Sequence, residues 1–163
     1  MWFVHRHRQR GFTLVELLLA MAVLGIITAI AIPNYQQMII DQRLRSASSD
    51  LHSTLMLARS EAIKRNDRVT VEMAGGSWQD GWAVMFNDDT VRIQDFIANV
   101  GITPEPDTLD ELIFDRSGRV VNITPGEIFT ICSNPPSGGN ERIIRIELNG
   151  MARVERGDTC PDS

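Results

Sequence analysis

Residues 6–33 read RHRQRGFTLVELLLAMAVLGIITAIAIP, and this stretch decides the architecture that we expect. A short basic segment ends at Gly11, and an apolar run follows at once, with Glu16 as its carboxylate. In an ordinary secretory signal the cleavage site lies after the apolar region, which is then discarded. Here the natural cleavage site, Gly11, precedes the apolar region, so that region would stay on the mature chain. A protein that keeps such a segment needs it for a membrane, for a helical assembly, or for both.

The segment GFTLVELL, residues 11–18, resembles the class III signal of type IV pilins and type II secretion pseudopilins. The resemblance implies that a prepilin peptidase cleaves after Gly11 and methylates the new N-terminal residue, Phe12. It also implies that Glu16 is the assembly carboxylate, paired in the filament with the Phe12 amine of a neighbouring subunit. A carboxylate at the centre of a membrane helix costs roughly 2.5–3.5 kcal/mol, and less near an interface, so it needs a partner or a proton. The alternative is a Glu16 that only reaches the membrane surface.

Segments later in the chain resemble one branch of that family. They are ARSEAI at residues 58–63, Gly81-Trp82, Ser117-Gly118 and the Asn149-Gly150 hairpin. The branch holds the H-type minor pseudopilins and the FimT and FimU minor pilins. The resemblance implies an α+β, type IV pilin-like fold, with a long N-terminal helix packed on an antiparallel β-sheet domain. It implies a non-enzymatic subunit that joins or primes a type IV pilus or a type II secretion pseudopilus. The sequence does not separate these two filaments.

The N-terminal half of the chain predicts one long helix in two parts. Residues 12–33 form the transmembrane and assembly segment, and Pro33 is expected to kink the helix without ending it. Residues 34–66 continue as an amphipathic helix, because apolar residues recur at steps of three or four. The expected core positions are Leu44, Ala47, Leu51, Leu55, Ala58 and Ala62.

Residues 67–163 predict an antiparallel β domain, since β-branched and aromatic residues alternate with turn formers. Trp78 and Trp82 are interpreted as core or edge aromatics. Residues 101–111 contain two prolines and four acids and are expected to form an exposed loop. The expected strands are residues 69–73, 82–86, 91–96, 112–114 with 120–121, 128–131, 142–148 and 151–155.

The charge distribution predicts the orientation of the chain. The leader, residues 1–11, carries three arginines and no acid, which favours a cytoplasmic position. The protein would then span the inner membrane once, with its β domain in the periplasm, before it enters a filament. Without the leader, 13 basic residues stand against 21 acidic ones, a formal net charge of −8. Such an acidic domain is a poor candidate for general nucleic-acid binding.

Two cysteines, Cys132 and Cys160, are present. An exported domain meets an oxidising compartment, so a disulfide between them is expected. Two free thiols or a metal-binding pair are the alternatives. Neither a CxxC spacing nor a nearby histidine supports the metal. No cofactor is expected, and no arrangement of serine, histidine and acid predicts an enzyme.

DNA binding during natural transformation is the alternative function. Some FimT-type minor pilins bind DNA through a Gly-Arg-x-Arg motif near the C-terminal hairpin. In the matching stretch here, Gly150 and Arg153 agree with the motif, Met151 replaces the first arginine, and Arg156 follows. The lost arginine removes one phosphate contact and its counterion release. The resemblance therefore predicts a solvated hairpin more strongly than a DNA site.

Overall fold

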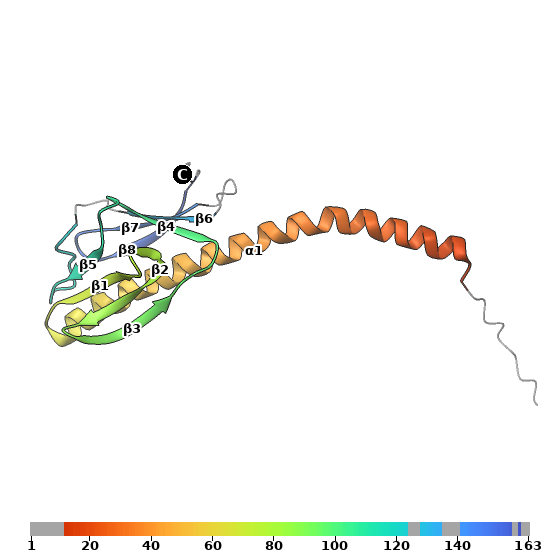
Figure 1. Ribbon diagram of the computed structural model, residues 1–163. Helices are drawn as coiled ribbons and strands as arrows, with labels where there is room; N and C mark the ends of the chain where they lie inside the picture. Colours follow the sequence, from red (N-terminus) through yellow and green to blue (C-terminus); the bar gives the residue numbers. More distant parts are fainter. Residues whose placement is uncertain (1–11, 124–127, 135–140, 158–159, 161–163) are drawn as a thin grey trace, which may run out of the picture. The chain divides into compact units, whose positions relative to one another are not determined.

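The computed structural model describes residues 12–123, 128–134, 141–157 and 160 (Figure 1). Within them it has one helix and eight strands, and it divides into two compact units, the second of which begins at Ile40. The helix, α1, spans Leu14–Arg65 and passes through Pro33. The strands are β1 (Val69–Ala74), β2 (Ser77–Phe86), β3 (Asp89–Asp95), β4 (Val100–Glu105), β5 (Glu111–Phe114), β6 (Ile128–Ser133), β7 (Arg142–Ile146) and β8 (Ala152–Arg156).

A capping interaction starts α1. The hydroxyl oxygen of Thr13 accepts a hydrogen bond from the backbone N–H of Glu16, at 3.3 Å. Thr13 thus satisfies one of the N–H groups that have no partner within the first turn of a helix. Thr13 and Glu16 are also spaced as in a capping box, Thr-x-x-Glu. The residues that carry the family resemblance therefore also fix where the helix begins.

The helix in the first unit exposes apolar side chains on every side. Phe12, which precedes the helix, is 81% exposed, and Leu14 is 74% exposed. A helix that is apolar all round belongs in a membrane or within an assembly. It is also long and apolar enough to span a membrane. The other large apolar residues exposed here are Val15, Leu17, Leu18, Leu19, Met21, Val23, Leu24, Ile26, Ile27, Ile30, Ile32, Tyr35 and Met38.

The helix in the second unit has one buried face, as its periodicity predicts. Leu44, Ala47, Leu51, Leu55, Ala58 and Ala62 are all at most 1% exposed. The helix ends in a Schellman motif, with Asn66 at a positive φ of 55°. Asp67 N–H bonds the carbonyl of Ala62, and Asn66 N–H bonds that of Ile63. The β domain can therefore start directly after the helix, at Val69.

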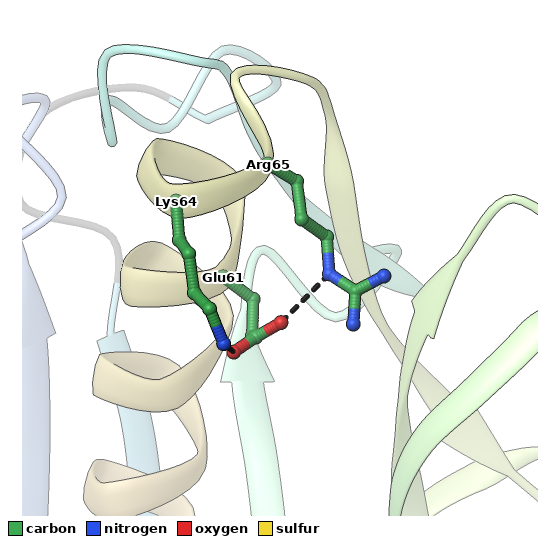
Figure 2. A network of polar contacts seen from close by, with 3 residues as sticks. All are labelled: Glu61, Lys64 and Arg65. Atoms are coloured by element: carbon green, nitrogen blue, oxygen red, sulfur yellow. Dashed lines mark hydrogen bonds and ion pairs between the residues drawn. The ribbon is translucent and has the colours of Figure 1, made fainter.

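Charged side chains surround Glu61 in the last turns of α1 (Figure 2). Its carboxylate accepts a hydrogen bond from Arg65 Nε at 2.7 Å and pairs with Lys64 Nζ at 3.4 Å. These contacts, the Arg65 bond foremost, hold the pKa of Glu61 below its usual value. The guanidinium of Arg65 also lies over the ring of Phe86, 4.4 Å from its centroid. The network joins the end of the helix to β2.

The strands form two antiparallel sheets of four rather than one. The first has the order β3-β2-β1-β5, and the second β4-β6-β7-β8 (Figure 1). Helix α1 is hydrogen-bonded to both. The Thr54 hydroxyl accepts a bond from Trp82 Nε1 on β2, at 3.1 Å. His52 Nε2 donates to the carbonyl of Ala152 on β8, at 3.1 Å.

The expectation of an exposed loop at residues 101–111 was wrong for its first half. Residues 100–105 form β4, which pairs along its whole length with β6. Pro104 can lie in this strand because β4 is at the edge of its sheet, where a missing N–H breaks no ladder. The exposed segment of this region is therefore shorter than predicted. Of the four acids, Glu105 ends β4, Asp107 and Asp110 lie between the two strands, and Glu111 begins β5.

Trp78 and Trp82, predicted as core or edge aromatics, both lie in the core, each 1% exposed. Trp78 packs edge-on against Phe129 of the second sheet, with the ring centroids 4.7 Å apart. Its Nε1 donates to the carbonyl of Leu109 at 2.6 Å. Trp78 thereby holds together the two sheets and the segment that links β4 to β5.

Candidate functional site

Phe12, just before α1, and Glu16, in its first turn, lie on the same side of the N-terminal segment. They line a shallow groove together with Leu19, Ala20, Val23, Leu24 and Ile27. These residues recur at steps of three or four, so they form one stripe along the helix. Glu16 is exposed and is the only acid of the first turn. The stripe offers an apolar surface with one carboxylate near its N-terminal end.

Two other residues predicted for this site, Gly11 and Pro33, belong to the same region of the chain. Gly11, the predicted cleavage site, lies outside the described residues. Pro33 is part of α1, but its side chain is not described. Thr13 was missed as a functional residue by sequence reasoning, although the Thr-x-x-Glu spacing was the signal that could have identified it as the cap.

Cys132 and Cys160 form the expected disulfide, with their Cα atoms 5.9 Å apart. Cys132 lies in β6, and Cys160 follows β8. The bond closes a segment that contains both β7 and β8. The cross-link therefore secures the C-terminal end of the chain to the second sheet.

The hairpin between β7 and β8 carries the residues of the possible DNA motif. Gly150 has a φ of 77° and is buried in the turn, where its N–H bonds the carbonyl of Glu147 at 2.8 Å. Arg153 and Arg156 are both exposed on β8. Because successive side chains of a strand alternate between its faces, these two arginines point to opposite sides of the sheet.

Arg153 lies on the same face as an ion pair. It is directly opposite Arg145 in the register of β7 and β8. Arg145 Nε is 3.0 Å from the carboxylate of Glu155, which follows Arg153 by two residues. One of the two arginines on this face is therefore already paired. The hairpin presents a mixed surface rather than a continuous basic one, and DNA binding stays a prediction.

The Ser117-Gly118 segment forms a tight turn. The Asp115 carboxylate accepts hydrogen bonds from the Ser117 hydroxyl at 2.6 Å and from the N–H groups of Ser117 and Arg119 at 2.8 and 3.0 Å. These bonds, that of the Ser117 hydroxyl foremost, lower the pKa of Asp115. One oxygen of the carboxylate, Oδ1, thus holds the turn. In the described part of the chain, no group of three or more His, Cys, Asp or Glu side chains could hold a metal ion.

Comparison with known families matches most of this architecture. Residues 47–151 match the family described as type II transport protein GspH. The chain belongs to the GspH family. Residues 6–32, which include Gly11 and Glu16, match the prokaryotic N-terminal methylation motif. Together the two matches extend over the apolar helix and nearly all of the β domain of this GspH-family protein.

Pilins are among the relatives of this GspH-family chain. A pilin-like protein of Thermus thermophilus, PilA1, is 31% identical, covering 90% of this chain and 99% of the relative. A fimbrial protein of Pseudomonas aeruginosa is 25% identical, covering 76% of this chain and 78% of its own. The chain is thus a minor pilin or pseudopilin of the type IV pilus or type II secretion family.

Solved structures with the same fold include minor subunits of both kinds of filament. The type IV minor pilin FimU of Pseudomonas aeruginosa has a TM-score of 0.62 at 22% identity, covering 74% of this chain and 96% of FimU. The minor pseudopilin EpsH from the type 2 secretion system of Vibrio cholerae has a TM-score of 0.52 at 18% identity, covering 68% of this chain and 94% of EpsH. These likenesses confirm the type IV pilin-like α+β fold.

Proposed function

We propose that this protein is a non-enzymatic filament subunit, cleaved after Gly11 by a prepilin peptidase and then built into a type IV pilus or type II secretion pseudopilus. The observation that carries the proposal is the fully exposed apolar helix that follows Phe12, with Glu16 in its first turn. A surface of this kind is not stable in water, because apolar area exposed to water is unfavourable. Before assembly the inner membrane covers it, and in the filament the helices of other pilin subunits do.

The proposed assembly step pairs Glu16 with the Phe12 amine of a neighbouring subunit. Cleavage after Gly11 would create this amine, which would become methylated, next to an apolar helix. Within a stack of apolar helices an unpaired carboxylate is costly, and an unpaired ammonium is equally so. Each subunit would therefore be held in register at the position in which its Glu16 carboxylate and the Phe12 ammonium of its neighbour neutralise each other.

The proposed topology divides the chain into four parts. Residues 1–11 are the leader and stay in the cytoplasm, and residues 12–33 cross the inner membrane. Residues 34–66 carry the helix into the periplasm, where residues 67–163 form the β domain. The basic leader supports this orientation, and so does the disulfide, since disulfides persist in oxidising compartments. The subunit would join the filament from this position, either along its length or as a primer of assembly.

The decisive experiment is the intact mass of the protein purified from its native membrane. We expect a mass that starts at Phe12 and carries one additional methyl group. A mass that starts at Met1 would reduce the N-terminal helix to a simple anchor and overturn the proposal. Replacing Gly11 by a bulky residue is the matched variant, and it should leave the chain uncut because the peptidase would no longer fit its site.

A deletion strain separates the two filaments. Loss of surface pili and twitching would assign the subunit to a pilus, and exported enzymes trapped in the periplasm would assign it to a secretion system. A deletion strain that keeps its surface pili and twitching and still exports its enzymes would contradict the proposal. DNA uptake is the remaining alternative, and binding of DNA to the purified chain that Arg153→Ala abolishes and salt weakens would support it.

A further inference from the structure

A methionine of the β7–β8 hairpin holds its sulfur against a guanidinium of α1. Met151 is 45% exposed, and Arg59 Nη1 donates a hydrogen bond to its sulfur at 3.1 Å. Arg59 Nε donates to the carbonyl of Gly118, which keeps the guanidinium beside the hairpin. A thioether sulfur is a weak acceptor, so this contact orients the side chain at little energetic cost. Met151 is therefore positioned by the fold and yet open to solvent.

The backbone of the turn also fixes Met151. Its N–H donates to Oδ1 of Asn149 at 2.8 Å, and its carbonyl accepts a hydrogen bond from the N–H of Glu147 at 3.0 Å. Gly150, the residue before it, has no room for a Cβ atom. Because both backbone groups are bonded, the side chain starts from a fixed point, and the guanidinium holds the sulfur near its other end. The hairpin thus presents one sulfur atom in a defined orientation.

The other methionines of the second unit are less accessible. Met56 and Met73 are partly buried and pack against the core. Met85 is partly buried as well, and its sulfur accepts a hydrogen bond from a threonine hydroxyl at 3.4 Å. Met151 is therefore the methionine of this unit that a small oxidant in water meets first.

Peroxides convert an accessible methionine into its sulfoxide. A lone pair of the sulfur attacks one oxygen of hydrogen peroxide, and the O–O bond breaks as the S–O bond forms. The proton of the transferred oxygen passes to the leaving hydroxide, which departs as water. The thioether is thereby oxidised by two electrons, and the peroxide is reduced. The sulfoxide is chiral at sulfur, and each of its two epimers is reduced by its own class of methionine sulfoxide reductase.

Arg59 makes the two sides of the Met151 sulfur unequal. A thioether sulfur can accept through a lone pair on either side of the plane of its two C–S bonds, and a peroxide can enter from either side. The hydrogen bond from Nη1 occupies one of these sides, and the guanidinium fills the space beyond it. The oxidant is left with the other side. A methionine in an unfolded chain has no such neighbour and forms both epimers.

We propose that Met151 is a reversible oxidation site for small peroxides, and that Arg59 restricts the product to one sulfoxide epimer. A single class of reductase would then suffice to restore the thioether. Every residue involved belongs to the second unit, so this site does not depend on the proposed filament function.

Limited oxidation of the full chain in detergent with hydrogen peroxide tests the site itself. Peptide mass spectrometry gives the rate of oxidation at each methionine. We expect Met151 to be oxidised about fivefold faster than the other three methionines of the second unit, because partly buried sulfur meets the oxidant less often. Met21 and Met38 are left out of the comparison, since detergent surrounds their apolar helix. A rate at Met151 no higher than at the other three would overturn the oxidation site.

The two reductase classes measure the ratio of epimers. The folded protein is oxidised and digested, and each reductase is then applied separately to the peptide that carries Met151. We expect one class to reduce about nine tenths of the sulfoxide and the other class only the remainder. The same chain oxidised in urea is the reference and should contain both epimers in similar amounts. Similar amounts from the folded protein would overturn the selection of one epimer.

Substitution of Arg59 tests whether its guanidinium makes the selection. Arg59→Leu removes the donor and retains an apolar stem, so the ratio of epimers should move to that of the urea-treated chain. Arg59→Lys keeps the charge without the planar fork and is the milder variant, which should lower the selectivity in part. Arg68→Leu removes another exposed arginine and should keep the single epimer. Full selectivity in a folded variant that lacks Arg59, or its equal loss in Arg68→Leu, would overturn the role of Arg59.

Discussion

Arg59 Nε donates a hydrogen bond to the carbonyl oxygen of Gly118, 3.2 Å away. Arg59 Nη1 also lies 3.1 Å from the sulfur of Met151. A single side chain of α1 thus contacts the turn after β5 and the hairpin of β7 and β8. Gly150 approaches the same carbonyl of Gly118 so closely that a Cβ atom at position 150 would collide with it. The junction of the helix with the two sheets depends on this narrow space.

Replacing Gly150 by Ala should destabilise the fold by roughly 2–4 kcal/mol, since a left-handed backbone and a steric collision both act against it. Gly76→Ala is the control, because Gly76 also has a positive φ, of 95°, but a Cβ there meets no atom within 4 Å. It should cost only about 1–2 kcal/mol. Urea unfolding of the full chain in detergent measures the difference. Equal losses in the two variants would contradict the close contact with Gly118.

Thr54→Val should lower the free energy of unfolding by about 1–3 kcal/mol, because the buried Nε1–H of Trp82 would lose its acceptor. The substitution hardly changes the volume of the side chain, so packing is preserved. Thr54→Ser keeps the hydroxyl and serves as the control. Tryptophan fluorescence during unfolding reports the effect. A valine variant as stable as the serine variant would show that the hydrogen bond adds nothing.

Glu61 should make stability depend on pH in the acidic range. Its pKa in the folded state lies below the reference value of 4.5, so its ion pairs stabilise the fold fully above about pH 4.5. This contribution is lost as the pH falls through the lowered folded pKa. In Glu61→Gln the loss should be absent, so the stabilities of the two proteins should converge on acidification. The control is Glu105→Gln, at an exposed acid without an ion pair in the described residues. A constant difference between pH 7 and pH 3 would refute the role of Glu61.

Removing the disulfide should destabilise the second unit. The cysteines are 28 residues apart, and the chain-entropy model assigns about 3–4 kcal/mol to a loop of this size. Cys132→Ser combined with Cys160→Ser should therefore unfold at a lower urea concentration than the oxidised protein. The reduced wild-type protein should behave like the double variant. If all three forms unfold together, the bond does not contribute to stability.

Glu16→Ala should leave the intact mass of the mature protein unchanged but lower its share in the filament fraction. Cleavage depends on the segment around Gly11, whereas the proposed pairing with a neighbour's amine depends on the carboxylate. Glu16→Asp retains the charge on a shorter side chain and should keep part of the incorporation. Full incorporation of the alanine variant would exclude the ion pair as the assembly contact.

Local structure could be predicted from the sequence where the spacing of apolar residues alone determined it. The six apolar positions from Leu44 to Ala62 are all buried, because their spacing alone defines a helix face. The division into two sheets was not predicted, since it depends on which strands pair across long separations. β1 pairs with β5 and β4 with β6, and no feature within these strands announces the partner. Strand β4 was missed because its proline and acids resemble a loop, and only its edge position explains them.

The N-terminal residues of the candidate site could be read from the sequence, because they form one contiguous motif. The contact of Arg59 with Gly118 could not be predicted. The two residues are 59 positions apart, and only the packing of α1 against the turn after β5 brings the Arg59 guanidinium to the Gly118 carbonyl. A contact of this kind has no signature along the chain.

The disulfide has a further consequence, for how the protein responds to proteases. Cys132 and Cys160 turn the stretch between them into a closed covalent ring that includes β7 and β8. A single cut anywhere inside the ring leaves both fragments attached to each other, so neither strand can diffuse away. A nicked subunit would run as an intact chain on a non-reducing gel and as two pieces only after reduction. Proteolytic damage in this part of the domain would therefore stay concealed as long as the compartment remains oxidising, because the cut fragments stay linked.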